Sequence, residues 1–236
     1  MLVTGIDACK SGWVAVTLAP SGARVTAAGV TAARVTAAGV TVARVTVAAA
    51  LGVLPMEGVT GIDMPLGLLA DGWRTADLLA RRALGRRGSC VFAIPPRSVW
   101  AQPSYAEARR RCRELTGRGL SAQAWGLRAK LLEADEFRRG GGHPLHEVHP
   151  ELSFAELAGA PLAETKHSAA GRARRRALLA AAGIALPERV RAAEDDLLDA
   201  AAVAWSALRI ASGTARVLPD PPAQRGDDGC EVAIRY

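Results

Sequence analysis

The sequence predicts an α/β domain built on a mixed sheet. Strand-like segments gather early in the chain, and helix-like segments then alternate with a few short strands. This order is typical of a mixed sheet flanked by helices. Half of the 236 residues are hydrophobic, enough to build one sizeable core. We find no linker long or polar enough to divide the chain, so residues 1–236 are predicted to form a single domain.

The strands are predicted from β-prone runs that end at turn residues. They lie in 1–20 (two strands), 58–69, 145–150 and 230–236. The first strand leads into Asp7. The apolar run "GVTGID" leads into Asp63 in the same way, because Pro65 and Gly67 then break the strand. Two predicted strands therefore end at an acid.

The helices are predicted from apolar residues at helical spacing. Predicted helices lie at 74–85, 104–119, 121–142, 151–160, 168–183 and 194–212, and an irregular Pro-rich segment lies at 89–100. Pro150 suits the first position of the helix that follows it. The last helix starts with several acids and is then almost wholly apolar, so it is predicted to be buried.

Residues 23–50 contain a ten-residue repeat, with "ARVTAAGVT" at 23–31 and again at 33–41, followed by "ARVTVAAA". Fewer than three full copies do not make a stable solenoid. We interpret the segment as a duplicated strand or hairpin tip inserted in the domain, with a dedicated binding surface as the alternative.

Composition excludes several classes of protein. The four cysteines are far apart, which argues against a zinc site. We see no signal peptide and no apolar run of about 18 residues, so the sequence predicts a cytoplasmic protein without a membrane span. The net charge of +7 is compatible with a polyanionic partner but does not require one. Arginine groups at 81–87, 109–113 and 172–176 are either solvated helix faces or phosphate contacts.

Acids occupy the positions where ligands bind in α/β proteins. Asp7 and Asp63 end strands, Glu147 lies in a short strand, and Asp196 and Asp199 share one face at the start of the last helix. If they converge, their repulsion requires a cation, and carboxylates are the ligands that Mg²⁺ takes. Two such ions can hold the reacting oxygens of a phosphodiester displacement.

Each of these residues also has a purely structural interpretation. The acids at 194–196 can cap the helix and complement its dipole, which we favour for Asp195. Asp7 and Asp63 can each start an Asx turn. Glu151 can be a first-turn residue stabilised by the helix dipole. His149 can be a ligand, a base or a hydrogen-bonded structural residue.

At this level of detail the chain resembles a known family. The segments "GIDACKSGWVAV", "GIDMPLGL", "RRALGRRGSCVFAIPPR", "EVHPELSF", "KHSAAGRARRRALL" and "DDLLDAAAVAWSALR" occur in the order seen in domain of unknown function 429. Its members are described as predicted nucleases of the ribonuclease H-like superfamily. The resemblance implies a mixed sheet of about five strands, the first three antiparallel, flanked by helices. The repeat is not part of the pattern.

The resemblance also implies roles for the acids. Asp7 takes the place of the first-strand Asp, and Asp63 that of the second strand-end acid. "DLLDA" is similar to the late-helix motif of Holliday-junction resolvases and points to Asp196 and Asp199. Either Glu147 or Glu151 would complete the set; we put Glu147 first. These acids are the predicted catalytic residues and the predicted ligands of two Mg²⁺ or Mn²⁺ ions.

Four basic residues are candidates for substrate binding. Arg is strongly preferred over Lys in this chain, yet Lys10, Lys130 and Lys166 lie in or near the family segments, where a compact ammonium can contact phosphate. Chance is the alternative explanation for three lysines. Arg97 ends the segment "SCVFAIPPR" and is the fourth candidate.

Three functions compete at this stage. The first is a metal-dependent nuclease acting on DNA or RNA by a two-metal carboxylate mechanism. The second is a non-catalytic module that binds nucleic acid or protein on the same fold. The third is an ATP-handling protein of the actin-like or sugar-kinase type, against which we count the missing second lobe. The sequence leaves DNA versus RNA and the oligomeric state open.

Overall fold

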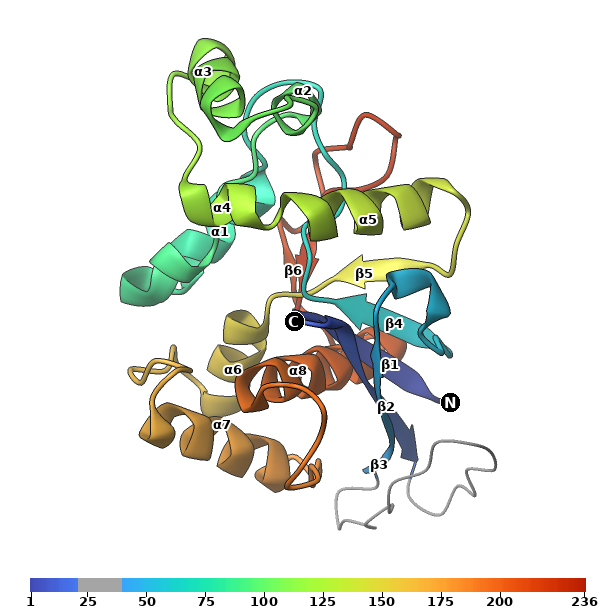
Figure 1. The fold of residues 1–236 in the computed structure, drawn as a ribbon. Coiled ribbons are helices and arrows are strands. Elements are labelled where there is room, and N and C mark those ends of the chain that lie inside the picture. The colour runs from blue at the N-terminus through green and yellow to red at the C-terminus, as the bar shows by residue number, and fades with distance from the viewer. Residues whose placement is uncertain (21–39) are drawn as a thin grey trace.

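The computed structural model describes residues 1–20 and 40–236, and its centre is a five-stranded mixed sheet (Figure 1). The strands are β1 (Val3–Cys9), β2 (Gly12–Pro20), β3 (Val40–Ala48), β4 (Val59–Ile62) and β5 (Leu145–Glu147). Their order is β3-β2-β1-β4-β5; the first three are antiparallel, and β1, β4 and β5 run parallel. This is the ribonuclease H-like sheet implied by the resemblance, and the predicted fold class is confirmed.

One face of the sheet is covered by the last long helix. The helices on this side are α6 (Pro150–Ala158), α7 (Ala169–Ala181) and α8 (Glu194–Ala211). Helix α8 packs directly on β1, β2 and β4, and α6 and α7 pack against α8. The buried face of α8 is rich in alanine, so the helix and the sheet approach closely.

Two glycines make this approach possible. A Cβ atom at Gly5 of β1 would lie 2.0 Å from the backbone nitrogen of Ala204, and one at Gly61 of β4 would lie 2.9 Å from the side chain of Val203. Neither distance is tolerable, so both positions require glycine. The main chain of α8 therefore rests on the main chain of β1, which fixes the distance between them.

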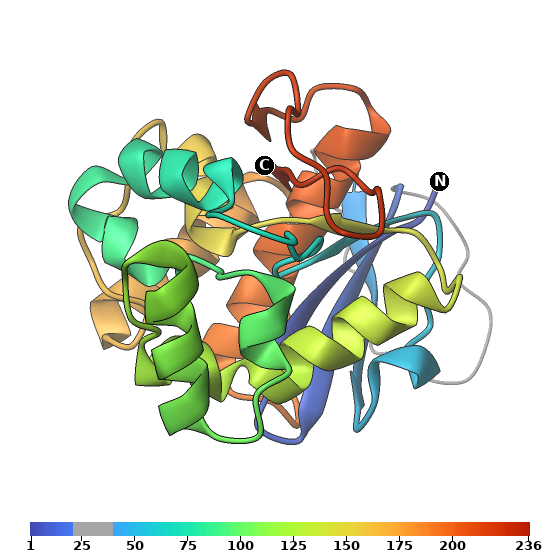
Figure 2. The ribbon, with the colours of Figure 1, turned by 90° about the horizontal axis from the view of Figure 1, so that it is seen from above.

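The other face of the sheet is covered by α5 (Arg128–Arg139). Leu131 and Ala134 of this helix pack in one core cluster with Ile6 and Ile62. The remaining helical segments are η1 (Leu51–Val53), α1 (Thr75–Ala83), η2 (Gly85–Cys90), α2 (Arg97–Trp100), α3 (Tyr105–Thr116) and α4 (Ala122–Gly126). Of these, α2, α3 and α4 lie in the upper part of Figure 1, and Figure 2 shows the molecule from above.

Several predicted elements differ from those observed. The predicted helix 121–142 is interrupted at Leu127, next to Gly126, a poor helix former. The predicted strand 145–150 stops at Glu147, because His149 caps α6 and Pro150 begins it. The predicted last strand is the two-residue β7 (Ile234–Arg235), which pairs with β6 (Val217–Leu218) in a small separate sheet.

The repeat contributes to the sheet. Its last part forms β3, which pairs antiparallel with β2 along its length. Residues 21–39 of the repeat and its flank lie outside the described residues. No helix among the described residues combines the length and the apolar character needed to cross a membrane.

Candidate metal centre

Three aspartates meet where β1, β4 and α8 come together. Asp7, Asp63 and Asp199 each offer a carboxylate oxygen, and these oxygens lie within 4.8 Å of one another. We call these three residues the acid cluster. Asp7 and Asp199 are 6 % and 2 % exposed, and Asp63 is half-buried. The predicted convergence of strand-end acids with the last helix is therefore observed for these three residues.

The register of the parallel strands brings the first two acids together. Ile6 pairs with Ile62, and the Asp63 N–H donates to the Ile6 carbonyl at 2.8 Å. Side chains alternate along a strand, so Asp7 faces the same side as Gly5, and Asp63 the same side as Gly61. Because both glycines contact α8, the two acids point toward that helix, whose second turn supplies Asp199.

Burial and mutual repulsion raise the pKa values of the acid cluster. The pKa of Asp7 is raised well above its ordinary value by burial and by the negative charges of Asp63 and Asp199. Burial raises the pKa of Asp63 and of Asp199 to about 6, in spite of the nearby ammonium of Lys166. Charged carboxylates at this density are unfavourable without further positive charge.

Lys166 is the cation that faces the acid cluster. Its Nζ lies 2.5 Å from Asp199 Oδ2, and the negative charges of Asp7 and Asp63 also raise its pKa. The other oxygen, Asp199 Oδ1, is buried and has no hydrogen-bond partner among the described residues. Asp7 Oδ1 accepts the Ala8 N–H at 2.7 Å.

Asp196 lies one turn before Asp199 on α8 and lines the same cavity. Burial and the neighbouring charge of Asp195 raise its pKa to about 6. Its own charge in turn raises the pKa of Asp7. Asp195 instead pairs with His167 at 3.2 Å. The structure thus places Asp196 beside the acid cluster and directs Asp195 elsewhere.

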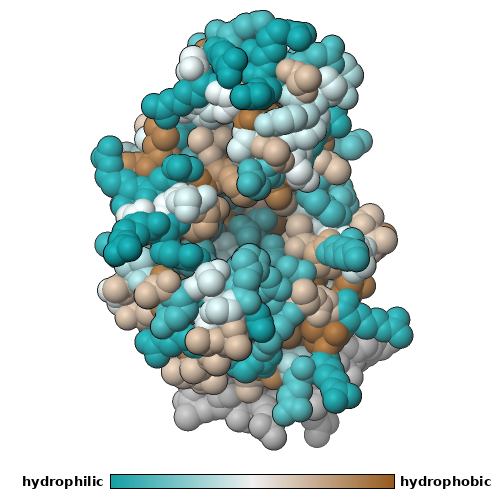
Figure 3. All heavy atoms as spheres, turned by 60° about the vertical axis from the view of Figure 1, so that its left-hand side comes forward, coloured by the Kyte–Doolittle hydropathy of each residue, from teal (hydrophilic) through white to brown (hydrophobic). Residues whose placement is uncertain are grey.

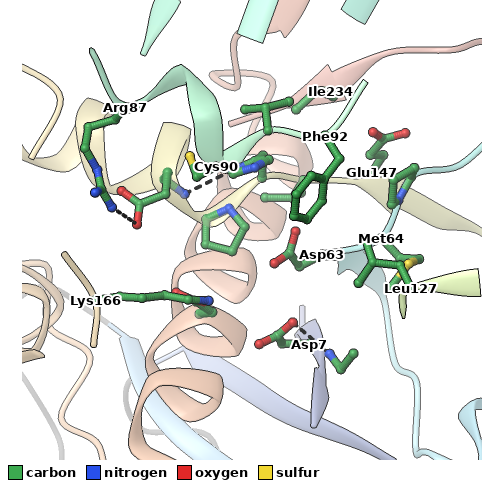
Figure 4. A pocket seen from close by; sticks show the side chains of 18 of the residues that line it. Asp7, Asp63, Met64, Arg87, Cys90, Phe92, Leu127, Glu147, Lys166 and Ile234 are labelled. Atoms are coloured by element: carbon green, nitrogen blue, oxygen red, sulfur yellow. Dashed lines mark hydrogen bonds and ion pairs between the residues drawn. The ribbon is translucent and has the colours of Figure 1, made fainter. Parts of the chain in front are cut away.

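The acid cluster opens into a cavity of about 490 Å³. In Figure 3 the surface is hollowed near its centre, and Figure 4 shows the side chains that surround the hollow. Lys166 and Arg87 lie on one side of the close-up view, and Met64 and Leu127 on the other. The cavity therefore combines acids, cations and an apolar wall.

Glu147 lines this cavity but is held by an arginine. Its oxygens lie 2.5 and 2.6 Å from Nη2 of the buried Arg74, and Oε2 also accepts the Leu66 N–H at 2.7 Å. Glu147 pairs with Ile62 in the sheet, so it faces the side opposite to Asp63. Arg74 also lies 3.4 Å from Asp77. Burial raises the pKa of Glu147 to about 7, and Arg74 opposes that shift.

Glu151, the alternative to Glu147, is also paired with arginines. Its Oε1 lies 2.6 Å from Nη2 of the buried Arg175 and 3.5 Å from Arg87. His149 caps α6 by accepting the Glu151 N–H at 3.3 Å, and burial lowers its pKa. We call Glu147 and Glu151 the arginine-paired acids. Neither belongs to the group of three that could share an ion.

Of the four basic candidates, the structure brings Lys166 to the cavity. Lys10, Arg97 and Lys130 are not among the described residues that line it. Arg97 pairs with Asp135 at 2.8 Å and with Asp227, and Lys130 pairs with Glu133 at 3.2 Å beneath the ring of Trp13. Lys10 lies exposed in the turn after β1.

The acid cluster fits a hard divalent cation. Three carboxylates face one ammonium, so two negative charges are left uncompensated when all are ionised. The partnerless Asp199 Oδ1 is a free oxygen ligand. Carboxylate oxygens are what Mg²⁺ and Mn²⁺ prefer.

Comparison with known proteins agrees with the resemblance read from the sequence. A family model described as "Protein of unknown function (DUF429)" matches residues 5–224. The chain belongs to the DUF429 family. All residues of the acid cluster lie within the matched region. A comparison with curated proteins gives no match.

Among solved structures, a RuvC chain from Thermus thermophilus matches this DUF429 chain. The identity is 17 %, the match covers 91 % of this chain and 98 % of that chain, and the TM-score is 0.33. That similarity is too low to carry any property of RuvC over to this chain.

Sequence reasoning missed Arg74 and Phe92, and it expected Arg175 to be solvated or to contact phosphate, whereas the structure buries it against Glu151. Arg74 and Arg175 neutralise the arginine-paired acids from 73 and 24 positions away in the chain. Phe92 lies in the segment predicted to be irregular, and its ring points into the cavity. The one available signal was its place in the family segment "SCVFAIPPR", which marks the segment but not the residue.

Proposed function

We propose that this DUF429 protein is a metal-dependent nuclease that hydrolyses phosphodiester bonds in DNA or RNA. The observation that carries the proposal is the buried acid cluster, with three converging carboxylates and one lysine at the floor of a cavity. A buried excess of negative charge is costly to a fold that gains nothing from it. Binding of a divalent cation removes that cost.

In this proposal Asp7, Asp63 and Asp199 hold the first Mg²⁺ or Mn²⁺ ion, and Asp196 helps to hold a second. Such ions supply the positive charge that stabilises the reacting oxygens of a phosphodiester displacement. Lys166 keeps the Asp199 carboxylate in place and offers an ammonium to a phosphate oxygen. Burial of the acids keeps bulk water out and strengthens each of these charge interactions.

A cleavage panel tests the proposal. Single-stranded DNA, duplex DNA, RNA, an RNA–DNA hybrid and a four-way junction are each incubated with the protein and Mg²⁺ or Mn²⁺. Asp7→Asn and Asp199→Asn remove a predicted ligand with little change of shape. Asp195→Asn is the matched control, because it removes an equivalent charge from the turn of α8 that precedes Asp199.

We expect cleavage of at least one substrate by the wild type and by Asp195→Asn. Cleavage should disappear with a chelator and in both ligand variants. A folded wild type that neither cuts any substrate nor binds Mg²⁺ or Mn²⁺ would disprove the proposal. Nucleic-acid binding that survives the chelator and Asp7→Asn, without cleavage, would instead indicate a binding module.

A further inference from the structure

The cavity beside the acid cluster has an apolar wall and a cationic side. Phe92, Met64 and Leu127 contribute apolar groups, while Arg87 and Lys166 contribute positive charge. Its volume of about 490 Å³ lies within the usual range for sites that enclose a small ligand, about 300–1,000 Å³. An aromatic base attached to a sugar phosphate has the same division into an apolar and an anionic part.

The segment that carries Phe92 is held in place by helix α1. Arg81 Nη1 donates to the Val91 carbonyl at 2.5 Å, and Asp77 Oδ2 accepts the Ile94 N–H at 2.8 Å. Two side chains of one helix thus fix the backbone on both sides of Phe92, although it lies in neither a helix nor a strand. The ring points into the cavity from a backbone that is already held in place.

Arg87 has spare hydrogen-bonding capacity at the cavity. Its contact with Glu151 is long, at 3.5 Å, whereas Arg175 binds the same oxygen at 2.6 Å. The Arg87 side chain lines the cavity and is 27 % exposed. A guanidinium in this state is suited to a phosphate, which accepts several of its donors at once.

From these observations we propose that the cavity binds one nucleotide of a single strand, with its base against Phe92 and a neighbouring phosphate on Arg87. This inference rests on the proposed nuclease function, which places the scissile phosphate at the acid cluster. The bases of an intact duplex are stacked and paired, and they cannot enter a walled cavity without leaving the helix. The preferred substrate is therefore a single-stranded region, a frayed end or a flap.

Equilibrium binding tests the inference without any cleavage step. Labelled single strands and a closed hairpin duplex of the same sequence are titrated by fluorescence anisotropy, with Ca²⁺ as the divalent ion. A series of abasic single strands, each lacking the base at a different position, is titrated in the same way. Phe92→Leu keeps apolar volume but removes the ring, and Phe92→Tyr is the matched control that keeps it. Arg87→Gln removes the charge, and Arg87→Lys keeps it.

We expect the single strand to bind more tightly than the hairpin. Phe92→Leu should weaken single-strand binding roughly 5- to 100-fold, as loss of one base–aromatic stack does, and Phe92→Tyr should not. One abasic strand should bind the wild type more weakly than the intact strand by a similar factor. The same abasic strand should bind Phe92→Leu as tightly as the intact strand does. Arg87→Gln should weaken binding about tenfold, with partial recovery in Arg87→Lys.

Equal binding of hairpin and single strand, or a Phe92→Leu effect that persists on every abasic strand, would overturn the inference while leaving the nuclease proposal intact. Base-dependent binding without metal-dependent cleavage of any substrate would overturn the nuclease proposal and retain the nucleotide cavity. If Phe92→Leu does not fold, the abasic series on the wild type decides, because a base bound in the cavity must show a position whose removal weakens binding.

Discussion

Two groups of buried carboxylates line the same cavity, and they differ in what neutralises them. In the acid cluster, three carboxylates face Lys166, and Asp199 Oδ1 has no hydrogen-bond partner among the described residues. Each arginine-paired acid has its own buried guanidinium, Arg74 for the first and Arg175 for the second. The first group shares a single cation among three carboxylates, whereas each acid of the second group has a buried guanidinium in direct contact.

The difference shows that burial alone does not identify an ion site. Burial raises the pKa of Asp63 and Asp199 to about 6 and that of Glu147 to about 7, so the direction of the shift is the same in both groups. What separates them is the number of cations that contact the carboxylates. Each arginine-paired acid has a buried guanidinium of its own, whereas the three acids of the cluster share Lys166.

The largest effect should come from breaking an arginine pair. Arg74→Met fills much of the space but leaves Glu147 and Asp77 buried without their cation, which should cost about 3–5 kcal/mol of unfolding free energy. Urea denaturation measures the loss. Arg110→Met, an exposed change on α3, should stay within about 0.5 kcal/mol of the wild type. A loss below about 1 kcal/mol for Arg74→Met would show that the pair is not structural.

The next effect separates the two groups by their response to metal. Mn²⁺ at about a hundred times its dissociation constant should stabilise the wild type by about 2.7 kcal/mol. Asp7→Asn should abolish that gain, and Glu147→Gln should retain it while lowering the starting stability. Thermal unfolding with and without Mn²⁺ measures both. Retention of the gain in Asp7→Asn would remove this residue from the ligand set.

Acid should weaken metal binding at the acid cluster. Asp63 and Asp199 have a pKa of about 6, and each must lose its proton to become a ligand. Below about pH 6 the apparent affinity for Mn²⁺ should fall by up to about tenfold per pH unit for each proton displaced, or 1.4 kcal/mol. Calorimetric titration at several pH values checks this. A constant affinity across that range would mean that these carboxylates are not displaced by protons.

The smallest effect concerns the metal-free protein. Asp63→Asn removes one of the repelling charges, so it should raise the unfolding free energy by about 1 kcal/mol above about pH 7. The folded protein binds the Asp63 proton more tightly than the unfolded chain does. The native state therefore loses stability as the pH rises through about 6, and the advantage of the variant should vanish at about pH 3, below the ordinary pKa of 3.8, where the carboxyl is protonated in both states. Chemical denaturation at the two pH values checks it, and Asp195→Asn is the control.

Much of the fold could be predicted because its signals are local. The β-prone runs that end at Pro20 and Asp63, and the apolar helix that follows Asp196, can each be recognised within a short window of sequence. The separate pairing of Ile234 depends on contact with the distant segment Val217–Leu218. No local pattern predicts it.

The acid cluster was partly predictable for the same reason. Asp7 lies near the end of β1, and Asp63 directly follows β4, which runs parallel to β1, so their neighbouring positions in the sheet follow from topology. Glu147 is the last residue of a third parallel strand, but its register places it on the opposite face of the sheet, and register cannot be read from the sequence of three residues. The scarcity of lysine drew attention equally to Lys166 and to Lys130. Only the structure shows that Lys166 faces the acid cluster, whereas Lys130 pairs with Glu133.

The backbone contact between Gly5 and Ala204 has a consequence for folding during protein synthesis. The acid cluster takes its members from the first strand, the fourth strand and the last long helix. During synthesis the first two acids emerge long before the third. The cluster is complete only after α8 has been made and has packed on β1, so a growing polypeptide lacks the finished centre until the residues up to Ala211 have been translated.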